Sequence, residues 1–254
     1  MTSDYLLLSD DKIFYTLEGE SKFVGQCSVF MRLFGCNLTC RGWATPDSPN
    51  GCDSYISWSV KNKMTFDEIF ELLDADEPGS YGSMVDRLRR GAIFKITGGE
   101  PMLRQEPLIR FIKAFQSRYQ FLPHIDFETN ATIMPDPYWT DIGATFTTSP
   151  KLTTNGDPEE KTYVPEVLAW HSKAGSVFKF VIADSSDVDE VWRKYVEDDN
   201  NINVSRHQIW FMPCCGSRSE HEVVAPIVAE FAKAMNVNFS PRLHLVLWNK
   251  ALRV

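Results

Sequence analysis

Apolar and polar positions along this chain follow two different periods. Short apolar runs rich in β-branched and aromatic residues are typical of buried strands, and apolar residues spaced three and four apart are typical of amphipathic helices. Strands are predicted at 27–33, 92–97, 124–129, 144–148, 176–182, 208–212 and 243–248. Helices are predicted after the capping box Thr65–Glu68, around 108–115, 164–173 and 188–197, and from the capping box Ser219–Glu222 to about Met235.

The alternation of strands with helices predicts an α/β fold built on a mostly parallel sheet. No linker rich in Pro, Gly or Ser interrupts the pattern, so residues 1–254 are expected to form a single domain. Parallel sheets place their chemistry at the carboxyl ends of the strands. The polar motifs of this chain fall there, since they begin at Cys36, Gly98, Glu128 and Ser149.

Composition and charge exclude several classes of protein. The 254 residues are 43% hydrophobic and 13% aromatic, which is ample for a folded core and excludes intrinsic disorder. The net charge of −8 and the absence of any Lys/Arg run longer than Arg89-Arg90 argue against a nucleic-acid partner. No apolar stretch approaches the ~18 residues of a membrane span, and the N-terminus has no signal-peptide pattern. We therefore expect a cytoplasmic protein without a membrane partner.

Three of the six cysteines crowd into a short segment, as Cys36, Cys40 and Cys52. Disulfides are rare in the cytoplasm, so clustered thiols indicate metal or redox chemistry. A structural zinc site normally takes four protein ligands, and the nearest histidine in sequence is His124. Three cysteines suit a 4Fe–4S cluster with one iron left open. A zinc site completed by a distant residue is the alternative.

The segment Gly98-Gly99-Glu100-Pro101 comes directly after the second predicted strand. Two glycines allow a backbone to approach a ligand closely, and a glutamate beside them can accept hydrogen bonds from an ammonium group. Taken alone, Gly-Gly after a strand is usually a turn. Its meaning here depends on the cysteines that precede it.

Together the cysteines and the Gly-Gly-Glu-Pro segment resemble the radical S-adenosylmethionine (radical SAM) superfamily. The resemblance implies that Cys36, Cys40 and Cys52 hold a 4Fe–4S cluster whose open iron binds the amino and carboxylate groups of S-adenosylmethionine. One electron from the cluster would cleave a carbon–sulfur bond, and the resulting 5′-deoxyadenosyl radical would abstract hydrogen. The cofactor performs the radical chemistry, while the protein supplies position and shielding.

Further motifs narrow the resemblance to the 7-carboxy-7-deazaguanine synthase family. The matching segments span nearly the whole chain in order, and this ordered set is specific although each member is short. They are Glu18-Gly19-Glu20, Gly25, the run from Val29 to Leu38, Cys52-Asp53-Ser54, Thr97 to Pro101, Glu128-Thr129-Asn130, Ser149-Pro150-Lys151, Lys179 to Ile182, Met212-Pro213 and Arg242-Leu243-His244.

This resemblance implies a partial (β/α)6-type barrel and a lyase activity. The lyase would convert 6-carboxy-5,6,7,8-tetrahydropterin to 7-carboxy-7-deazaguanine with release of ammonia, on the route to deazapurine nucleosides such as queuosine. The implied cofactors are the 4Fe–4S cluster, S-adenosylmethionine and Mg²⁺. The implied partners are the pterin, a reductant protein such as flavodoxin or ferredoxin, and a second copy of the chain in a homodimer.

The resemblance also assigns binding roles, although it assigns no catalytic acid or base. S-adenosylmethionine binding is expected at Gly98, Gly99, Glu100, Glu128, Asn130, Ser149 and Lys151. Substrate binding is expected at Glu18, Gly19, Glu20, Arg32 and Thr97, and Mg²⁺ binding at Ser54. A buried arginine without a partner is costly, so Arg32 is expected to meet the substrate carboxylate or, alternatively, to pair with Glu20.

The chain departs from the family pattern in the cysteine region. The usual spacing is Cys-x3-Cys-x2-Cys, but here Trp43 fills the third position and the next cysteine is Cys52, which predicts an inserted loop at 43–51. The insert contains turn formers, and a longer loop costs little extra closure entropy, so Cys52 is expected to return as the third ligand. Glu18 also replaces a usual Gln, and Ser21 a usual Gly, which bears on substrate identity.

Other residues keep two interpretations. Cys27 is expected in the core, and Cys214 and Cys215 are expected to be incidental thiols, with the third cluster ligand as their rival role. His244 and Trp248 either line the site or fill core positions. The alternative functions are another radical SAM reaction, such as activation of a glycyl-radical enzyme, or a non-enzymatic zinc- or cluster-binding protein.

Overall fold

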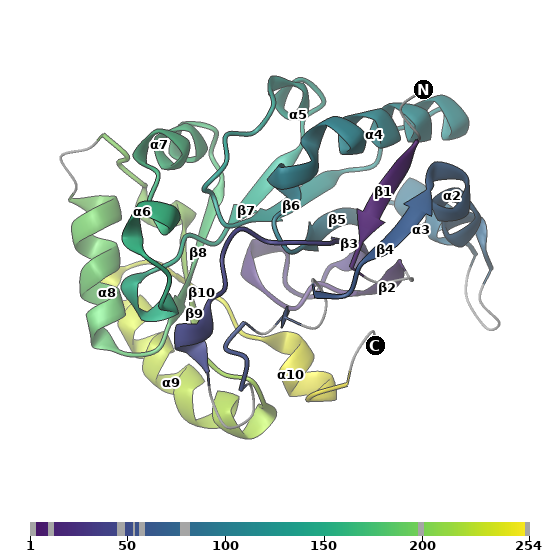
Figure 1. Ribbon diagram of the computed structural model, residues 1–254. Helices are drawn as coiled ribbons and strands as arrows, with labels where there is room; N and C mark the ends of the chain where they lie inside the picture. Colours follow the sequence, from purple (N-terminus) through teal and green to yellow (C-terminus); the bar gives the residue numbers. More distant parts are fainter. Residues whose placement is uncertain are drawn as a thin grey trace.

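The structure is a computed structural model, and it describes residues 4–9, 13–44, 49–52, 54–55, 59–76, 82–197 and 201–251. Part of the predicted insert at 43–51 lies outside the described residues, as does Asp53. Figure 1 shows a strongly curved sheet with helices packed along its outer side.

One sheet runs through the described residues in the order β10-β9-β8-β7-β6-β5-β3-β1-β4, with β2 paired to β3. Its strands are β1 (Tyr5–Leu8), β2 (Phe14–Leu17), β3 (Cys27–Leu33), β4 (Asn62–Thr65), β5 (Ile93–Gly98), β6 (Ile125–Thr129), β7 (Thr145–Thr148), β8 (Val177–Ile182), β9 (Ile209–Pro213) and β10 (Asn238–Phe239). Every pair from β3 to β10 along this order is parallel, whereas β1, β2 and β4 pair antiparallel. The predicted mostly parallel α/β sheet is confirmed.

The helices follow the strands along the chain. They are α2 (Phe66–Asp74), α3 (Met84–Arg89), α4 (Gln105–Tyr119), α5 (Pro137–Asp141), α6 (Glu159–Thr162), α7 (Pro165–Lys173), α8 (Ser185–Val191), α9 (Arg218–Met235) and α10 (Leu243–Trp248). Short turns of other helix types lie at Ser21–Phe23, Arg41–Trp43, Pro101–Arg104, Thr153–Asn155, Trp192–Val196 and Arg206–Gln208. No described helix has the length and apolarity needed to cross a membrane.

The capping box predicted at Thr65 opens α2. Thr65 N donates to Glu68 Oε2 at 2.6 Å, and Glu68 N donates back to Thr65 Oγ1 at 3.3 Å. The apolar face predicted for this helix is buried, and it consists of Phe66, Ile69, Phe70 and Leu73. Both expectations are confirmed, because local capping and helical periodicity act within a few residues of one another.

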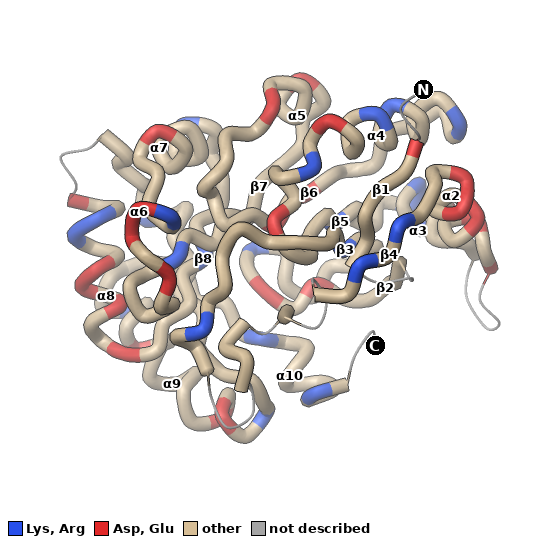
Figure 2. Tube along the Cα trace, in the orientation of Figure 1, with Lys and Arg blue, Asp and Glu red and all other residues tan. Residues whose placement is uncertain are grey.

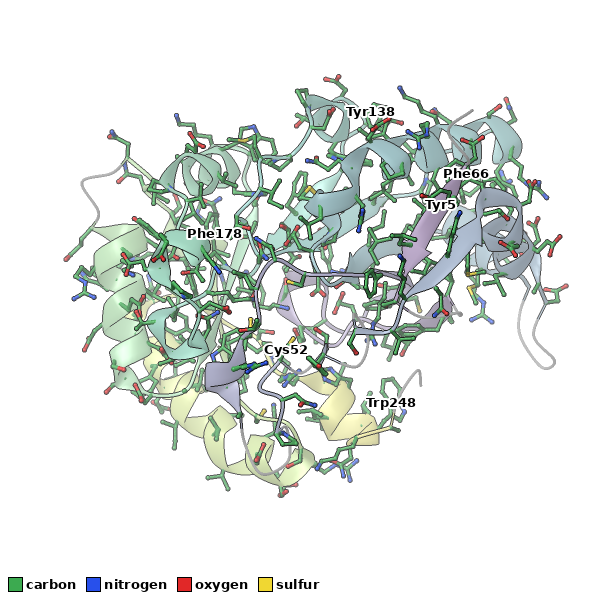
Figure 3. All side chains as sticks on the ribbon, viewed as in Figure 1. Tyr5, Cys52, Phe66, Tyr138, Phe178 and Trp248 are labelled. Atoms are coloured by element: carbon green, nitrogen blue, oxygen red, sulfur yellow. The ribbon has the colours of Figure 1, made fainter. Side chains whose placement is uncertain are left out.

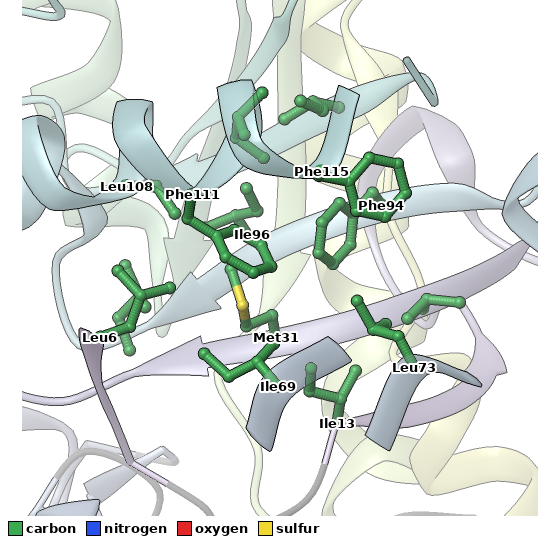
Figure 4. Packing of buried hydrophobic residues seen from close by; sticks show 14 of the residues in the cluster. Leu6, Ile13, Met31, Ile69, Leu73, Phe94, Ile96, Leu108, Phe111 and Phe115 are labelled. Atoms are coloured by element: carbon green, nitrogen blue, oxygen red, sulfur yellow. The ribbon is translucent and has the colours of Figure 1, made fainter. Parts of the chain in front are cut away.

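The core consists of two groups of buried apolar residues on the helix side of the sheet. One includes Met31, Phe94 and Ile96 from β3 and β5, packed against α2 and α4 (Figure 4). The other includes Phe178, Phe180 and Phe211 from β8 and β9, together with residues of α7, α8 and α9. These groups fix the strands whose carboxyl ends carry the polar motifs.

One predicted strand and one predicted helix cap near the C-terminal end are wrong, whereas the helix predicted to end at about Met235 is present as α9. Residues 243–248 form α10 and not a strand, because the sheet already ends at β10 and only Leu245 of this helix is buried. A short apolar run does not by itself distinguish the two structures. The cap of α9 is Ser217, whose side chain accepts from Glu220 N at 3.2 Å, so the predicted cap Ser219 lies inside the first turn.

The strands β1, β2, β4 and β10 are not among the predicted elements. Each is four residues or shorter, and β2 and β4 carry few fully buried side chains, so their apolar period is weak. Cys27, expected in the core, is exposed where β3 starts beside β2. Figure 2 shows Lys and Arg interspersed with Asp and Glu along outer elements such as α4.

Candidate active site

A cavity of about 550 Å³ lies at the carboxyl ends of the parallel strands. Residues from the ends of β3, β5, β6, β8 and β9 line it, which is the location expected for a site in a parallel sheet. Apart from Glu100, every site residue expected from the sequence lines this cavity. These residues are Glu18, Gly19, Glu20, Arg32, Cys36, Cys40, Cys52, Ser54, Thr97, Gly98, Gly99, Glu128, Asn130, Ser149 and Lys151.

The three candidate cluster cysteines occupy one part of the cavity. Burial raises the pKa of Cys40 to about 12; Lys151 lowers it, and the Cys52 and Cys36 thiols raise it. Burial also raises the pKa of Cys36, to which Cys52 again contributes. The thiols are therefore close enough to act on one another, and Figure 3 shows Cys52 near the middle of the molecule.

A single metal ion and a 4Fe–4S cluster make different demands on the three thiols. Among the described residues, no three Cys, His, Asp or Glu side chains converge so that one metal ion could bind all of them. The geometry therefore gives no support to a zinc site built from these residues. In a 4Fe–4S cluster each cysteine thiolate binds a different iron. The cysteine sulfurs are therefore spread around the cluster and do not converge on one atom. Three thiols on the wall of one cavity fit that requirement.

The end of the insert packs against the segment that carries Cys40. Gly51 has a φ of 79°, in the region that favours glycine, and a Cβ there would overlap the backbone of Cys40 and Arg41. Cys52 follows directly, with its Sγ 3.5 Å from Ser54 Oγ. The chain thus returns to the Cys40 segment at the point where a third thiol is needed.

Gly99 lets two motifs approach each other. Gly99 N donates to Leu33 O at 2.9 Å, and Glu100 N donates to Gly35 O at 2.9 Å. A Cβ on Gly99 would overlap the carbonyl of Gly35. The glycine therefore serves close contact within the protein, and it fixes the end of β5 against the residue that precedes Cys36.

Glu100 turns its carboxylate into the protein. It is fully buried and accepts hydrogen bonds from Met102 N at 2.9 Å, Thr129 Oγ1 at 2.8 Å and Asn130 N at 2.7 Å. It was expected to accept from the ammonium of S-adenosylmethionine, but this side chain does not line the cavity. In the structure Glu100 instead binds the backbone of Asn130. The Nδ2 of Asn130 lies 3.9 Å from Cys36 Sγ.

Lys151 lies between the cysteines and the polar end of β7. Its Nζ donates to Ser149 Oγ at 2.9 Å and lies 5.1 Å from the centre of the Trp43 ring. An ammonium over an aromatic face is held by electrostatic attraction. Trp43, which replaces the usual third cysteine, thus helps to place a positive charge beside the thiols.

At the other end of the cavity, carboxylates and cations are paired. Lys179 Nζ lies 2.5 Å from Glu20 Oε2 and 3.1 Å from Glu128 Oε1, and Arg242 Nε lies 3.0 Å from Glu20 Oε1. Burial raises the pKa of Glu20, but Lys179 and Arg242 outweigh it and hold that pKa well below its usual value. Burial also opposes ionisation of Glu128, yet Lys179 and then Lys95 bring its pKa to about 2. Both carboxylates are therefore ionised acceptors.

Glu18 belongs to a second buried pair. Lys95 Nζ lies 2.7 Å from Glu18 Oε2 and 2.7 Å from Asp126 Oδ2. Burial raises the pKa of Glu18, and Lys95 opposes that rise. Burial lowers the pKa of Lys95, but Asp126 and Glu18 outweigh it and raise that pKa. Glu18 and Glu20 therefore do not form an exposed acidic turn, since their side chains are only 3% and 13% exposed.

Arg32 is half-buried at the end of β3 and lines the cavity. Its guanidinium carbon lies 5.0 Å from the centre of the Phe14 ring. Glu20, the alternative partner considered for Arg32, is engaged by Lys179 and Arg242.

The segment 240–251 forms the remaining wall of the cavity. Ser21 N donates to Ser240 Oγ at 2.6 Å, and Leu243 N donates to Gly19 O at 2.8 Å. His244 and Trp248 both line the cavity, which supports the first of their two interpretations. Figure 3 shows Trp248 on α10, beside the C-terminal end of the described chain.

Several residues around the cavity were not expected from the sequence. They are Lys95, Asn155 and Asp157, and none of them belongs to a recognisable sequence motif. Their partners lie far away in the chain; Asp157, for example, binds Thr39. Cys214 and Cys215 do not line the cavity. Cys215 is buried, and its carbonyl accepts from Arg242 Nη1.

Comparisons with known proteins agree on one group of enzymes. No protein-family profile matches the chain. The 7-carboxy-7-deazaguanine synthase of Hyperthermus butylicus is 28% identical over 246 residues, covering 93% of this chain and 91% of the relative. The synthase of the same name from Pyrobaculum aerophilum is 28% identical over 244 residues, covering 94% of both. That of Rhodospirillum rubrum is 35% identical over 178 residues, covering 68% of this chain and 57% of the relative.

A solved structure has the same fold. The crystal structure of QueE from Escherichia coli superposes with a TM-score of 0.59, covering 94% of this chain and 95% of that one at 18% identity. The likeness confirms the expected partial-barrel fold of mostly parallel strands.

Proposed function

This chain belongs to the 7-carboxy-7-deazaguanine synthase family of radical SAM enzymes, and from that premise we propose that it converts 6-carboxy-5,6,7,8-tetrahydropterin to 7-carboxy-7-deazaguanine with release of ammonia. One observation carries the proposal: a single cavity has three cysteine thiols at one end and buried, paired carboxylates and cations at the other. The first end suits a cluster, and the second suits a polar heterocycle with N–H donors and a carboxylate.

At the cysteine end, Cys36, Cys40 and Cys52 would hold the 4Fe–4S cluster. With S-adenosylmethionine bound, that cluster supplies a carbon radical that abstracts hydrogen from the substrate. The ammonium of Lys151 and the hydroxyl of Ser149, 2.9 Å apart, would bind the carboxylate or ribose of the cofactor. The backbone at Gly98 and Gly99 forms the neighbouring wall.

At the charged end, the carboxyl oxygens of Glu20 and Glu18 would accept hydrogen bonds from the amino and ring N–H groups of the pterin. Arg32 would bind the substrate carboxylate, because a guanidinium forms strong charge-assisted pairs with that group. Thr97 donates its hydroxyl hydrogen to Glu128 at 2.9 Å, which orients both side chains at the end of the sheet. These contacts fix the pterin without requiring a protein acid or base.

Ser54 would contribute a hydroxyl ligand to Mg²⁺ beside the substrate. Magnesium commonly takes few protein ligands and completes its shell with substrate oxygens and water. Ser54 lines the cavity and its Oγ lies 3.5 Å from Cys52 Sγ, so its hydroxyl would be available to an ion bound in the cavity.

The remaining proposals concern the setting of the enzyme. We expect a cytoplasmic homodimer reduced by a protein such as flavodoxin or ferredoxin, with no nucleic-acid or membrane partner. The cavity has a volume of about 550 Å³, which is the size of a small-molecule pocket. This size favours a small molecule over the protein substrate that a glycyl-radical activating enzyme would need.

The test is anaerobic turnover of the reconstituted protein with 6-carboxytetrahydropterin, S-adenosylmethionine, dithionite and Mg²⁺. Mass spectrometry should detect 7-carboxy-7-deazaguanine and ammonia release in equal amounts. The Cys36→Ala variant is the matched control and should form neither. Cleavage of S-adenosylmethionine by the wild type without conversion of the pterin would contradict the proposed substrate while leaving the superfamily assignment intact.

A further inference from the structure

We propose that Asn155 raises the reduction potential of the cluster by donating an N–H to the sulfur of Cys40, within a loop that clamps the cysteine segment in place. The inference rests on the proposed function, because it concerns the cluster which that function requires. Asn155 does not line the cavity. It would therefore act through Cys40 as a positioning residue.

The clamp begins with Asp157, which binds the backbone of the cysteine segment. Its Oδ2 accepts from Thr39 N at 3.0 Å and from Cys40 N at 2.7 Å, and its Oδ1 accepts from Thr39 Oγ1 at 2.9 Å. Hydrogen bonds to an ionised carboxylate are stronger than neutral ones. One side chain thus holds two successive amides directly at a cluster ligand, where Cys40 adopts a left-handed φ of 51°.

Asn155 extends the clamp to the sulfur itself. It is fully buried, and its Nδ2 lies 3.7 Å from Cys40 Sγ and 3.0 Å from Asp157 Oδ2. Its Oδ1 accepts from Asp157 N at 3.0 Å. That bond requires an oxygen at this position, so the other end of the amide, which faces the sulfur, is the NH₂ donor.

The loop that carries these residues is itself fixed to α8. Thr153 N donates to Glu190 Oε2 at 3.0 Å, and Thr154 Oγ1 donates to Asp187 Oδ1 at 2.7 Å. Both acceptors are buried. The amide donor therefore cannot move away from the sulfur without breaking contacts to a helix of the outer layer.

A donor at this position has an electronic consequence. Reduction adds negative charge to the cluster and its thiolates, and hydrogen bonds to the sulfurs are one of the factors that set the potential. An N–H pointing at Cys40 stabilises the reduced state more than the oxidised state. Its loss should make the cluster harder to reduce.

The experiment compares wild type with Asn155→Leu and Asn155→Ser in anaerobic redox titrations of the reconstituted protein, followed by EPR of the reduced cluster. We expect the equilibrium constant for reduction to fall about tenfold in both variants, which is about 59 mV for a one-electron couple. Thr153→Val is the matched control in the same loop, because it removes the hydroxyl bond to Glu190 and leaves the donor to Cys40 in place. It should load a full cluster at the wild-type potential.

A second measurement tests the contact between Asn155 and the cluster by spectroscopy. Wild-type protein and Asn130→Ala, both labelled with ¹⁵N at the asparagine side-chain amide, should show a ¹⁵N hyperfine coupling to the reduced cluster. Loss of this coupling in Asn155→Ser would assign it. The inference is overturned if both Asn155 variants load a full cluster at the wild-type potential, or if neither labelled protein shows the coupling. A wild type that binds no cluster at all would instead refute the proposed function.

Discussion

The ammonium of Lys95 lies 2.7 Å from the carboxylate of Glu18, and both side chains are buried. Glu18 stands where the family usually has a neutral Gln, so this chain has added a buried negative charge beside its cavity. Lys95 also meets Asp126 at 2.7 Å, and Asp126 accepts from Thr145 and Thr147. The carboxyl group of Glu18 is therefore paired with the positive charge of Lys95 inside the protein.

We predict that Lys95→Met destabilises the protein by about 3–5 kcal/mol, because it leaves two buried carboxylates without their cation. The double variant with Glu18→Gln should recover part of that loss, since one of the two charges is then removed. Denaturant unfolding of the three proteins measures both effects. Lys233→Met, which removes an exposed pair to Glu230, is the control and should cost at most about 1 kcal/mol. Equal stability of the single and double variants would contradict the pairing.

Arg32→Ala should weaken substrate binding far more than cofactor binding. Loss of a charge-assisted pair typically costs about 1.5–3 kcal/mol, or roughly a tenfold to hundredfold rise in the KM for the pterin. The KM for S-adenosylmethionine should stay near its wild-type value. Steady-state kinetics measure both constants, and an unchanged pterin KM would count against the assignment.

Cys52 should behave as the third cluster ligand. Single Ala variants of Cys36, Cys40 and Cys52 are expected to lose bound iron and reductive cleavage of S-adenosylmethionine. Variants of Cys27, Cys214 and Cys215 should remain near normal, because none of these three lines the cavity. Iron per chain after anaerobic reconstitution is the readout. A Cys52→Ala protein that keeps a full cluster and cleaves the cofactor would transfer the role to another thiol.

Ser54→Ala should reduce the stimulation of turnover by Mg²⁺ while cluster content stays intact. The physical reason is the loss of one hard oxygen ligand next to the substrate. Turnover is measured across a Mg²⁺ titration, with Ser59→Ala, an exposed serine nearby in the sequence, as the control. An identical Mg²⁺ response in Ser54→Ala and wild type would leave Ser54 with a structural role only.

Acid should destabilise the protein partly through His171. Burial lowers the pKa of this side chain to about 3, whereas the unfolded chain has the usual value near 6.5. The unfolded state thus binds more protons below pH 6.5, so stability is lost as the pH falls. Between pH 7 and pH 5 this group should cost about 2 kcal/mol.

The variant His171→Phe keeps an aromatic ring against Phe146 and Trp170, and it should lose stability less steeply over that pH range. Unfolding free energies at pH 7, 6 and 5 give the slopes. His207→Gln, at an exposed position, is the control and should retain the wild-type slope. Parallel curves for wild type and His171→Phe would exclude the contribution.

Local signals in the sequence were sufficient for the elements that carry the parallel sheet. Residues 27–33 could be predicted as a buried strand because most side chains of β3 are buried. The capping box Thr65–Glu68 could be predicted because all of its hydrogen-bonding groups lie within four consecutive residues. Strands β1 and β4 could not be predicted in this way, because each is only four residues long and no side chain of β4 is buried. Leu243–Trp248 has strand composition but forms a helix that lines the cavity.

The candidate site shows the same difference between local motifs, which could be predicted, and contacts between distant segments, which could not. The cysteines and the Gly98-Gly99 pair could be found from spacing and from the resemblance to a family, since each is a short motif. The direction of the Glu100 carboxylate could not, because it depends on Thr129 and Asn130 at the end of another strand. Asp157 is 118 residues from Thr39 in the chain. A contact over that separation leaves no pattern among neighbouring residues, so it could not be predicted from the sequence.

The wall formed by the segment 240–251 makes the cavity a product of both ends of the chain. Glu20 and Arg242, which pair at 3.0 Å, are 222 residues apart in the sequence. A chain shortened before Arg242 would keep Cys36, Cys40 and Cys52 but lose part of the charged end that we propose binds the pterin.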